Sequence, residues 1–130
     1  MKINLIHHIA IICSDYSISK AFYTKILGFE VLQEVYREHR NSYKLDLALN
    51  DTYIIELFSF PSPPPRPSRP ESCGLRHIAF EVDDVEASKK YLETHGIEVE
   101  TIRIDEYTGR KFTFFADPDE LPIEIYEREV

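Results

Sequence analysis

Residues Leu75–Val82 read LRHIAFEV, and a close counterpart, IHHIAII, occupies Ile6–Ile12 near the N-terminus. Each stretch is a short apolar run in which a histidine is followed by Ile-Ala. The two histidines at this position, His8 and His77, are 69 residues apart. Both runs have the length and composition of strands. One copy would carry little information, but the pair indicates an internal repeat.

Two further residue pairs recur at almost the same separation. Glu56 in the run YIIELF and Glu124 in the run LPIEIY are 68 residues apart, and so are Gly28 and Gly96. Matching separations between residues of the same type support the repeat. We therefore interpret the chain as two similar halves, each contributing one histidine and one glutamate from strands.

The first half is predicted to follow the order β-α-β-β-β. Ser14 or Asp15 is a suitable N-cap for an amphipathic helix that ends at Gly28. Asn50-Asp51 is typical of a tight hairpin turn. The expected strands are residues 6–12, 29–36, 43–49 and 53–58.

The second half is predicted to repeat this order. Asp84 is the expected N-cap of a helix that Gly96 ends. Val85, Ser88, Leu92 and the neighbouring Tyr91 are expected on its inner face. The expected strands are residues 75–82, 98–104, 111–115 and 121–126, with turns at 108–109 and 117–119.

A proline-rich stretch joins the two halves. Residues 61–70, PSPPPRPSRP, contain six prolines in ten positions, which favours an extended connector and excludes a helix or a central strand. A ligand for an SH3-type domain is the alternative interpretation. We expect one domain over residues 1–130, with module one at 1–60, the linker at 61–74 and module two at 75–130.

The amino-acid composition argues against some classes of function. The chain is 43% apolar and 29% charged, which is ordinary for a soluble globular domain. Its formal net charge of −8 argues against nucleic acid as a partner, because polyanion binding needs a basic surface. No apolar run approaches membrane-spanning length and no signal peptide is evident, so we expect a cytoplasmic protein without a membrane partner. Cys13 and Cys73 lack Cys-x-x-Cys spacing and are expected to be reduced thiols that mainly pack.

Strand alternation places the two repeated histidines beside small residues. His8 should share a face with Ala10, and His77 should share a face with Ala79, which leaves space next to each imidazole. His7 is one residue out of phase and is expected to face the opposite side. Both repeated histidines should therefore point into the space that each sheet curves around.

Glu56 and Glu124 both lie inside apolar strand sequences. A carboxylate inside an apolar strand is costly to bury unless it is paired, hydrogen-bonded or bound to a metal. A lone strand histidine is usually an ordinary core or surface residue, and a lone strand glutamate is usually solvated. Two histidine–glutamate pairs in equivalent positions instead suggest a site for a divalent metal with open positions. The predicted ligands are His8, Glu56, His77 and Glu124.

Four segments also resemble a known family: HHIAIICSDYSISKAFYTKILGFEV, YIIELF, GLRHIAFEVDDVEA and FTFFADPDELPIEIYE. They are similar to the vicinal oxygen chelate superfamily, which includes glyoxalase I, fosfomycin-resistance proteins, bleomycin-binding proteins, methylmalonyl-CoA epimerase and extradiol dioxygenases. The resemblance implies an α+β fold of two repeated βαβββ modules, whose curved sheets form around a metal-binding cavity. It further implies that the four predicted ligands match the metal-ligand positions of glyoxalase I-like members.

The resemblance also implies a mechanism. One divalent transition metal, zinc or nickel before cobalt or manganese, would chelate two adjacent substrate oxygens and stabilise an enediolate. Glu124, with Glu56 opposite, would act as the catalytic carboxylate that moves a proton. Relatives that cleave rings or modify fosfomycin use two histidines and one glutamate, and bleomycin-binding members lack the metal set. A lyase or isomerase is therefore the leading expectation.

The sequence does not identify the substrate. Ile12 and Phe60 stand where bacterial glutathione-dependent glyoxalase I proteins carry an arginine and an asparagine that contact glutathione. A small dicarbonyl or a thiol adduct is expected as the substrate, with or without glutathione. The alternatives are a non-catalytic small-molecule binding protein, an epimerase or a thiol transferase of the same fold. A homodimer is expected, with the site within one chain or across two.

Overall fold

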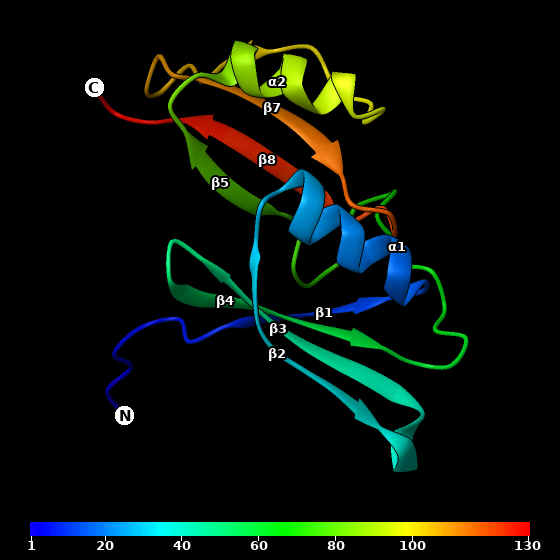
Figure 1. Ribbon diagram of the computed structural model, residues 1–130. Helices are drawn as coiled ribbons and strands as arrows, with labels where there is room; N and C mark the ends of the chain where they lie inside the picture. Colours follow the sequence, from blue (N-terminus) through cyan, green and yellow to red (C-terminus); the bar gives the residue numbers. More distant parts are fainter. The chain divides into compact units, whose positions relative to one another are not determined.

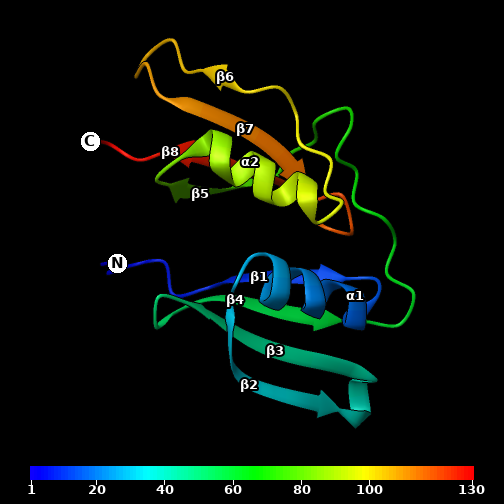
Figure 2. The same cartoon turned by 45° about the horizontal axis from the view of Figure 1, so that its top comes forward.

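The computed structural model describes all of residues 1–130, which form two compact units, Met1–Pro65 and Arg66–Val130. Each unit contains one four-stranded sheet with a helix over one of its faces (Figures 1 and 2). The element order in each unit is β-α-β-β-β. The predicted α+β class with two repeated βαβββ modules and curved sheets is therefore confirmed.

In the first unit, strand β1 is parallel to β4, and the other neighbours are antiparallel in the order β1-β4-β3-β2. A π-helical segment, Phe22–Ile26, continues directly from α1, and a short 3-10 helix, Glu38–Arg40, follows β2. The regular elements are β1 Ile9–Cys13, α1 Tyr16–Ala21, β2 Glu30–Arg37, β3 Ser42–Leu49 and β4 Thr52–Ser59.

Local signals in the first unit act as predicted. Asp15 is the N-cap of α1, and its carboxylate accepts a hydrogen bond of 3.0 Å from the Ile18 amide. Asn50 and Asp51 have φ values of 49° and 62°, so both central residues of the β3–β4 hairpin are left-handed, as a type I′ turn requires. The hairpin therefore fixes which residues of β3 face β4.

The second unit repeats this topology with the order β5-β8-β7-β6, in which β5 is parallel to β8. Asp84 is the N-cap of α2 and accepts a hydrogen bond of 2.9 Å from the Ala87 amide, as predicted. The elements are β5 Ile78–Val82, α2 Val85–Thr94, β6 Arg103–Ile104, β7 Lys111–Ala116 and β8 Pro122–Glu127.

Three predicted strands are shorter than expected, and the one predicted at residues 6–12 spans only Ile9–Cys13. The strand predicted at residues 98–104 is reduced to Arg103–Ile104. Glu100 still donates its amide hydrogen to the Phe114 carbonyl at 2.9 Å, but its own carbonyl accepts a hydrogen bond from the Thr113 hydroxyl on β7, also at 2.9 Å. The strand predicted at 75–82 begins only at Ile78, which pairs with Ile123. Pro122 precedes Ile123 and has no amide hydrogen to extend the ladder.

Each unit has its own apolar core between helix and sheet. Val85 and Leu92 of α2 are buried as predicted, but Tyr91 is 44% exposed and its ring packs on His95 instead of the sheet. The buried apolar side chains of the first unit are Ile11, Cys13, Phe22, Tyr23, Phe29, Leu45, Leu47, Ala48, Ile55 and Leu57. Those of the second unit are Ile78, Val85, Leu92, Val99, Phe115, Leu121, Ile123 and Ile125.

The proline-rich stretch contains no helix or strand, as predicted. Its second part is tied to the second unit, because the Ser68 hydroxyl donates to the Glu120 carbonyl at 2.9 Å. Neither cysteine is in a disulfide; Cys13 is buried, whereas Cys73 is exposed and does not pack as expected. No helix is long and apolar enough to cross a membrane.

Candidate functional site

The first predicted pair lies on the open face of the first sheet. The Nε2 atom of His8 is 3.4 Å from Oε2 of Glu56, and the two side chains are 35% and 14% exposed. The parallel register of β1 and β4 sets Ala10 beside Glu56, and the small alanine leaves room for the imidazole two residues earlier. His8 itself lies one residue before β1, so the prediction that the strand contains it is wrong by one position.

The second predicted pair has the same construction. The Nε2 atom of His77 is 3.1 Å from Oε2 of Glu124, with the side chains 27% and 13% exposed. Ala79 on β5 lies beside Glu124 on β8. His77, like His8, stands just before its strand. The repeat seen in the sequence is thus reproduced in the geometry of the two histidine–glutamate pairs.

The donor chemistry of both pairs fits a transition metal. Histidine nitrogen and carboxylate oxygen bind zinc-like ions at about 2.0–2.2 Å, so two such ligands of one ion lie roughly 3.0–3.5 Å apart at ordinary coordination angles. The two observed separations of 3.4 and 3.1 Å lie in this range. Each pair supplies two ligands, and no group of three or more histidine, cysteine or acidic side chains occurs in the chain as described.

Polar neighbours hold the Glu56 carboxylate. The Tyr53 hydroxyl donates to Glu56 Oε2 at 2.5 Å and also lies 3.2 Å from Asp46. The Lys44 ammonium is 2.6 Å from Asp46 and 3.8 Å from Glu56. Burial, and then the hydrogen bond to Glu56, raise the pKa of Tyr53, so the phenol stays a donor. Sequence reasoning missed Tyr53 and Lys44, although both share the Glu56 hairpin.

The surroundings of Glu124 are less polar. Phe114 on β7 is its cross-strand neighbour, and the Phe114 ring packs edge-to-face on the His77 imidazole with centroids 5.1 Å apart. On the other side of the ring, Arg76 Nη1 is 3.4 Å from His77 Nδ1. The second pair therefore combines an aromatic wall with one cation, whereas the first pair has a hydroxyl, an ammonium and a second carboxylate.

His7 does not face away from His8, as alternation predicted. Their Nδ1 atoms are 2.8 Å apart, and the His7 ring packs against Tyr53 with centroids 5.4 Å apart. Both histidines precede β1, so strand alternation does not govern them. When His8 donates its Nδ1 hydrogen to His7, the lone pair of His8 Nε2 points toward Glu56, which is the tautomer that metal ligation needs.

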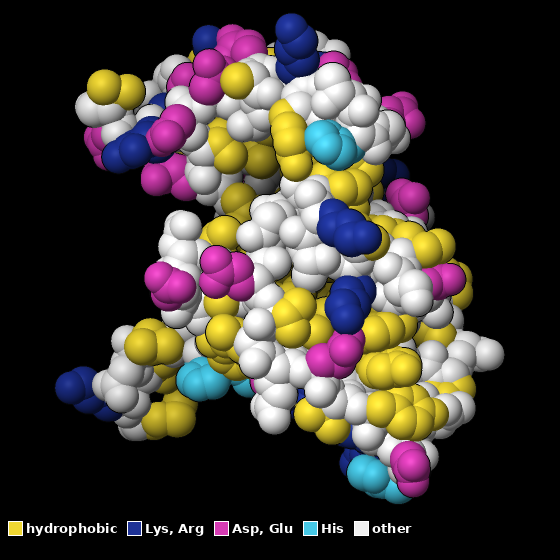
Figure 3. All heavy atoms as spheres, viewed as in Figure 1, with side chains coloured by type: hydrophobic (Ala, Val, Ile, Leu, Met, Phe, Trp, Pro, Cys, Tyr) yellow, Lys and Arg dark blue, Asp and Glu magenta, His cyan; other side chains and the backbone are white.

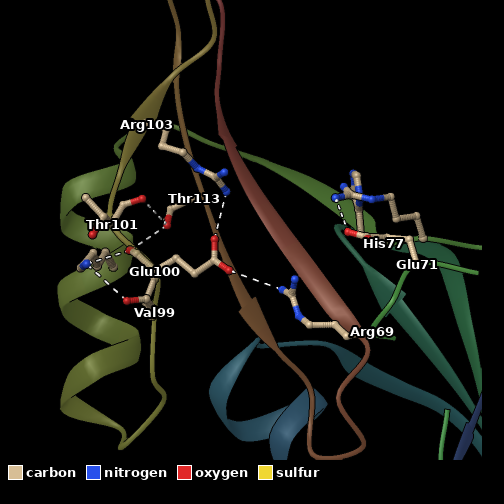
Figure 4. A network of polar contacts seen from close by, with 10 residues as sticks. Arg69, Glu71, His77, Val99, Glu100, Thr101, Arg103 and Thr113 are labelled. Atoms are coloured by element: carbon tan, nitrogen blue, oxygen red, sulfur yellow. Dashed lines mark hydrogen bonds and ion pairs between the residues drawn. The ribbon is translucent and has the colours of Figure 1, made fainter. Parts of the chain in front are cut away.

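A separate polar network holds the segment before β6. Figure 4 shows the Glu100 carboxylate between two arginines, 3.8 Å from Arg69 and 2.9 Å from Arg103. Lys89 of α2 donates to the Glu100 carbonyl at 2.8 Å. These contacts are satisfied within the network and tie the linker to the second unit. On the face drawn in Figure 3, acidic and basic side chains are interspersed, without a continuous basic patch.

The family follows from comparison with known proteins. Residues 5–125 match the model of the Glyoxalase/Bleomycin resistance protein/Dioxygenase superfamily. The chain belongs to this superfamily. Its fold agrees with the expectation drawn from the resemblance to the vicinal oxygen chelate proteins.

Close members of the superfamily resemble the chain over nearly its whole length. It is 64% identical over 123 residues to YaeR of Escherichia coli (strain K12), an uncharacterized protein, with 95% of each chain covered. It is 61% identical over 128 residues to the uncharacterized YwkD of Bacillus subtilis (strain 168), covering 98% of this chain and 100% of the relative. The crystal structure of a glyoxalase family protein from Enterococcus faecalis superposes with a TM-score of 0.88 at 49% identity, covering 95% and 97% of the two chains.

Two more distant members have names that state an activity. A 2-epi-5-epi-valiolone epimerase from Actinomyces sp is 27% identical over 141 aligned positions, covering 92% of this chain and 77% of the relative. The trypanothione-dependent glyoxalase I of Leishmania major superposes with a TM-score of 0.71 at 25% identity, covering 95% and 86% of the chains. Both activities occur within the superfamily, and neither relative is close to this chain.

Proposed function

We propose that His8, Glu56, His77 and Glu124 together hold one divalent transition metal in a lyase or isomerase of the glyoxalase I type. The observation that carries the proposal is the repeated pair, with Nε2 to Oε2 separations of 3.4 and 3.1 Å. Two nitrogens and two oxygens suit zinc or nickel, and also cobalt or manganese. The substrate would be a small dicarbonyl or a thiol adduct.

The metal would supply positive charge for two adjacent substrate oxygens. The carboxylates then have different tasks. Glu56 is held by the Tyr53 hydroxyl and lies near Lys44, so we assign it the role of a fixed ligand. Glu124 contacts His77 and the aromatic wall of Phe114, which leaves its carboxylate freer to turn toward a substrate carbon. We therefore assign proton transfer at the carbon next to the chelated oxygens to Glu124.

Other activities of the fold make weaker use of these residues. A thiol transferase would need two histidines and one glutamate, so Glu56 would be surplus. An epimerase uses the same proton chemistry, and the Actinomyces relative bears such a name. A non-catalytic binding protein would need no carboxylate placed for proton transfer. Assembly as a homodimer would let the four ligands come from one chain or from two.

Metal analysis with matched variants tests the ligand set. The purified protein should contain about one transition-metal ion per four-ligand site, and His77→Ala should lose it. His39→Ala is the matched control, since His39 is an exposed residue of the 3-10 helix after β2. Full metal occupancy in the His77→Ala protein would contradict the proposal.

Activity assays then separate the enzyme from a binding protein. The metal-loaded protein should convert the hemithioacetal of methylglyoxal with glutathione or with a simpler thiol, or exchange the proton next to its carbonyl in deuterated buffer. Glu124→Gln should retain most of the metal and lose the exchange. Tight binding of adducts without any exchange would favour the binding protein.

A further inference from the structure

Arg37, the last residue of β2, holds a positive charge that no acidic side chain neutralises. Its guanidinium lies over the rings of Phe58 and Phe60, at 4.7 and 5.7 Å from their centroids. Its Nη2 donates to the hydroxyl of Ser42, which is fully buried, at 2.9 Å. No aspartate or glutamate oxygen lies within 4.0 Å of it. Arg37 is also the one half-buried residue of an otherwise exposed strand.

Arg37 differs in this respect from the other two arginines that stack on rings. Arg103 lies 5.0 Å from the Phe112 centroid and is paired with Glu100 at 2.9 Å. Arg110 lies 5.9 Å from the Tyr126 centroid and is paired with Glu129 at 2.9 Å. The chain has 23 acidic and 15 basic residues, so a lack of carboxylates does not explain the exception.

The guanidinium of Arg37 is oriented before any ligand arrives. Its Nε atom is buried without a hydrogen-bond partner, and stacking fixes the plane of the group. With Nη2 giving one hydrogen bond to Ser42, the other hydrogens at the Nη end remain for an outside acceptor. A planar fork held in this way loses little entropy when it binds an oxyanion in two-point fashion.

Arg37 also packs on the face of the sheet that carries the first histidine–glutamate pair. Phe58, on which it stacks, is two residues after Glu56 and shares its face of β4, at about 7 Å along the strand. Lys44 is the cross-strand neighbour of Phe58 and reaches toward Glu56. An anionic group at Arg37 would thus lie on the order of 10 Å from the Glu56 carboxylate, the reach of a short flexible ligand.

We propose that Arg37 binds an oxyanion of the substrate, a carboxylate or a phosphate, and thereby selects anionic substrates. This substrate class rests on the proposed function, but the anion contact itself does not require the metal. Arg37 is on β2, whereas Ile12 is on β1 and Phe60 follows β4. Ile12 and Phe60 are the two positions that match the glutathione contacts of bacterial glyoxalase I proteins. The adduct that the site accepts would carry its anion several bonds away from the chelated oxygens.

Titration with simple anions tests the contact directly. Succinate and inorganic phosphate are added to the isotope-labelled protein, and the Arg37 Nε–H and Ser42 amide resonances are followed by NMR. Saturable shifts of both resonances are expected. The anion that binds more tightly shows whether the site prefers a carboxylate or a phosphate. Arg37→Met should weaken binding at least about tenfold, and Arg37→Lys should weaken it less, since the charge persists without the fork.

Controls separate this result from general electrostatics and from failure of the metal site. Arg40→Met removes an equal charge three residues away and should leave anion binding unchanged. Metal content of Arg37→Met should equal that of the unmodified protein, so loss of anion binding with metal retained identifies the subsite alone. Absence of saturable shifts up to tens of millimolar, or equal shifts in Arg37→Met, would overturn the proposal.

Discussion

Tyr53 donates its hydroxyl hydrogen to Oε2 of Glu56, the same oxygen that lies 3.4 Å from His8 Nε2. Tyr53 lies three positions before Glu56, so regular alternation would put them on opposite faces of β4. The register between β3 and β4 shifts at Leu47 and Ala48, where Ile55 pairs with Leu47 and Tyr53 pairs with Ala48. This bulge turns Tyr53 onto the face of Glu56.

Removing the Tyr53 hydroxyl should therefore weaken metal binding. In Tyr53→Phe, the Glu56 carboxylate loses the donor that orients it, and we expect about a tenfold loss of metal affinity. The change is measured by competition with a chelator of known affinity. Tyr107→Phe, at a residue that is 90% exposed, is the control. An unaltered metal affinity in Tyr53→Phe would mean that Tyr53 does not orient the ligand.

His7 should act on the metal through His8. In His7→Ala, the Nδ1 atom of His8 loses its hydrogen-bond partner at 2.8 Å, so the ring is free to adopt the tautomer that cannot present Nε2 to a metal. We expect about a tenfold loss of metal affinity and a change in the free energy of unfolding within about 0.5 kcal/mol, because the side chain is exposed. His7→Gln keeps an acceptor and should recover part of the affinity. A loss of stability equal to that of a core variant would contradict this positioning role.

Most of the fold was predictable because its signals are local and occur twice. Asp15 and Asp84 cap their helices through side-chain contacts that span three residues. Asn50 and Asp51 adopt the left-handed backbone typical of their residue types. The repeated spacing then allowed each half to support the assignment of the other. Such signals depend on neighbouring residues and need no knowledge of tertiary packing.

The errors arose where tertiary contacts replaced the local pattern. Residues 98–104 have the composition of a strand, but the Glu100 carbonyl accepts from the side chains of Thr113 and Lys89, and only Arg103–Ile104 form a strand. His7 joins His8 because neither belongs to a strand. Tyr53 reaches Glu56 only through a bulge, which no periodicity indicates. The four ligands were proposed from the sequence, whereas the contacts of His7 with His8 and of Tyr53 with Glu56 required the structure.

The ion pair of Glu34 should make stability depend on pH. Hydrogen bonds from Lys20, at 2.6 Å, and then from Tyr16 lower the pKa of Glu34 below its ordinary value of 4.5. Because the unfolded chain binds this proton more tightly, the stabilisation is complete above about pH 4.5 and is lost as pH falls through the lowered folded pKa.

The corresponding variant is Glu34→Gln. Its free energy of unfolding in urea should be lower than that of the unmodified protein by about 0.2–1 kcal/mol at pH 7, since the pair is partly exposed. The difference should shrink steadily as the pH is lowered from 4.5 to 3. Glu38→Gln, a nearby exposed residue without an ion pair, should show no such trend. A difference that stays constant with pH would exclude the linkage.

Thr113 and Lys89 share one acceptor, and this predicts that their effects on stability are not additive. The Thr113 hydroxyl donates to the Glu100 carbonyl at 2.9 Å, and the Lys89 ammonium donates to the same oxygen at 2.8 Å. Thr113 is fully buried, so the near-isosteric Thr113→Val should lower the free energy of unfolding by about 1–2 kcal/mol. Lys89→Met alone should lower the free energy of unfolding by less, because the Thr113 hydroxyl still donates to the carbonyl.

In the double variant the Glu100 carbonyl oxygen loses both donors, so the loss of unfolding free energy should exceed the sum of the single losses by about 0.5–1 kcal/mol. Urea unfolding of the four proteins measures this coupling, with Lys90→Met in place of Lys89→Met as the control, and strict additivity would show that the carbonyl is satisfied elsewhere.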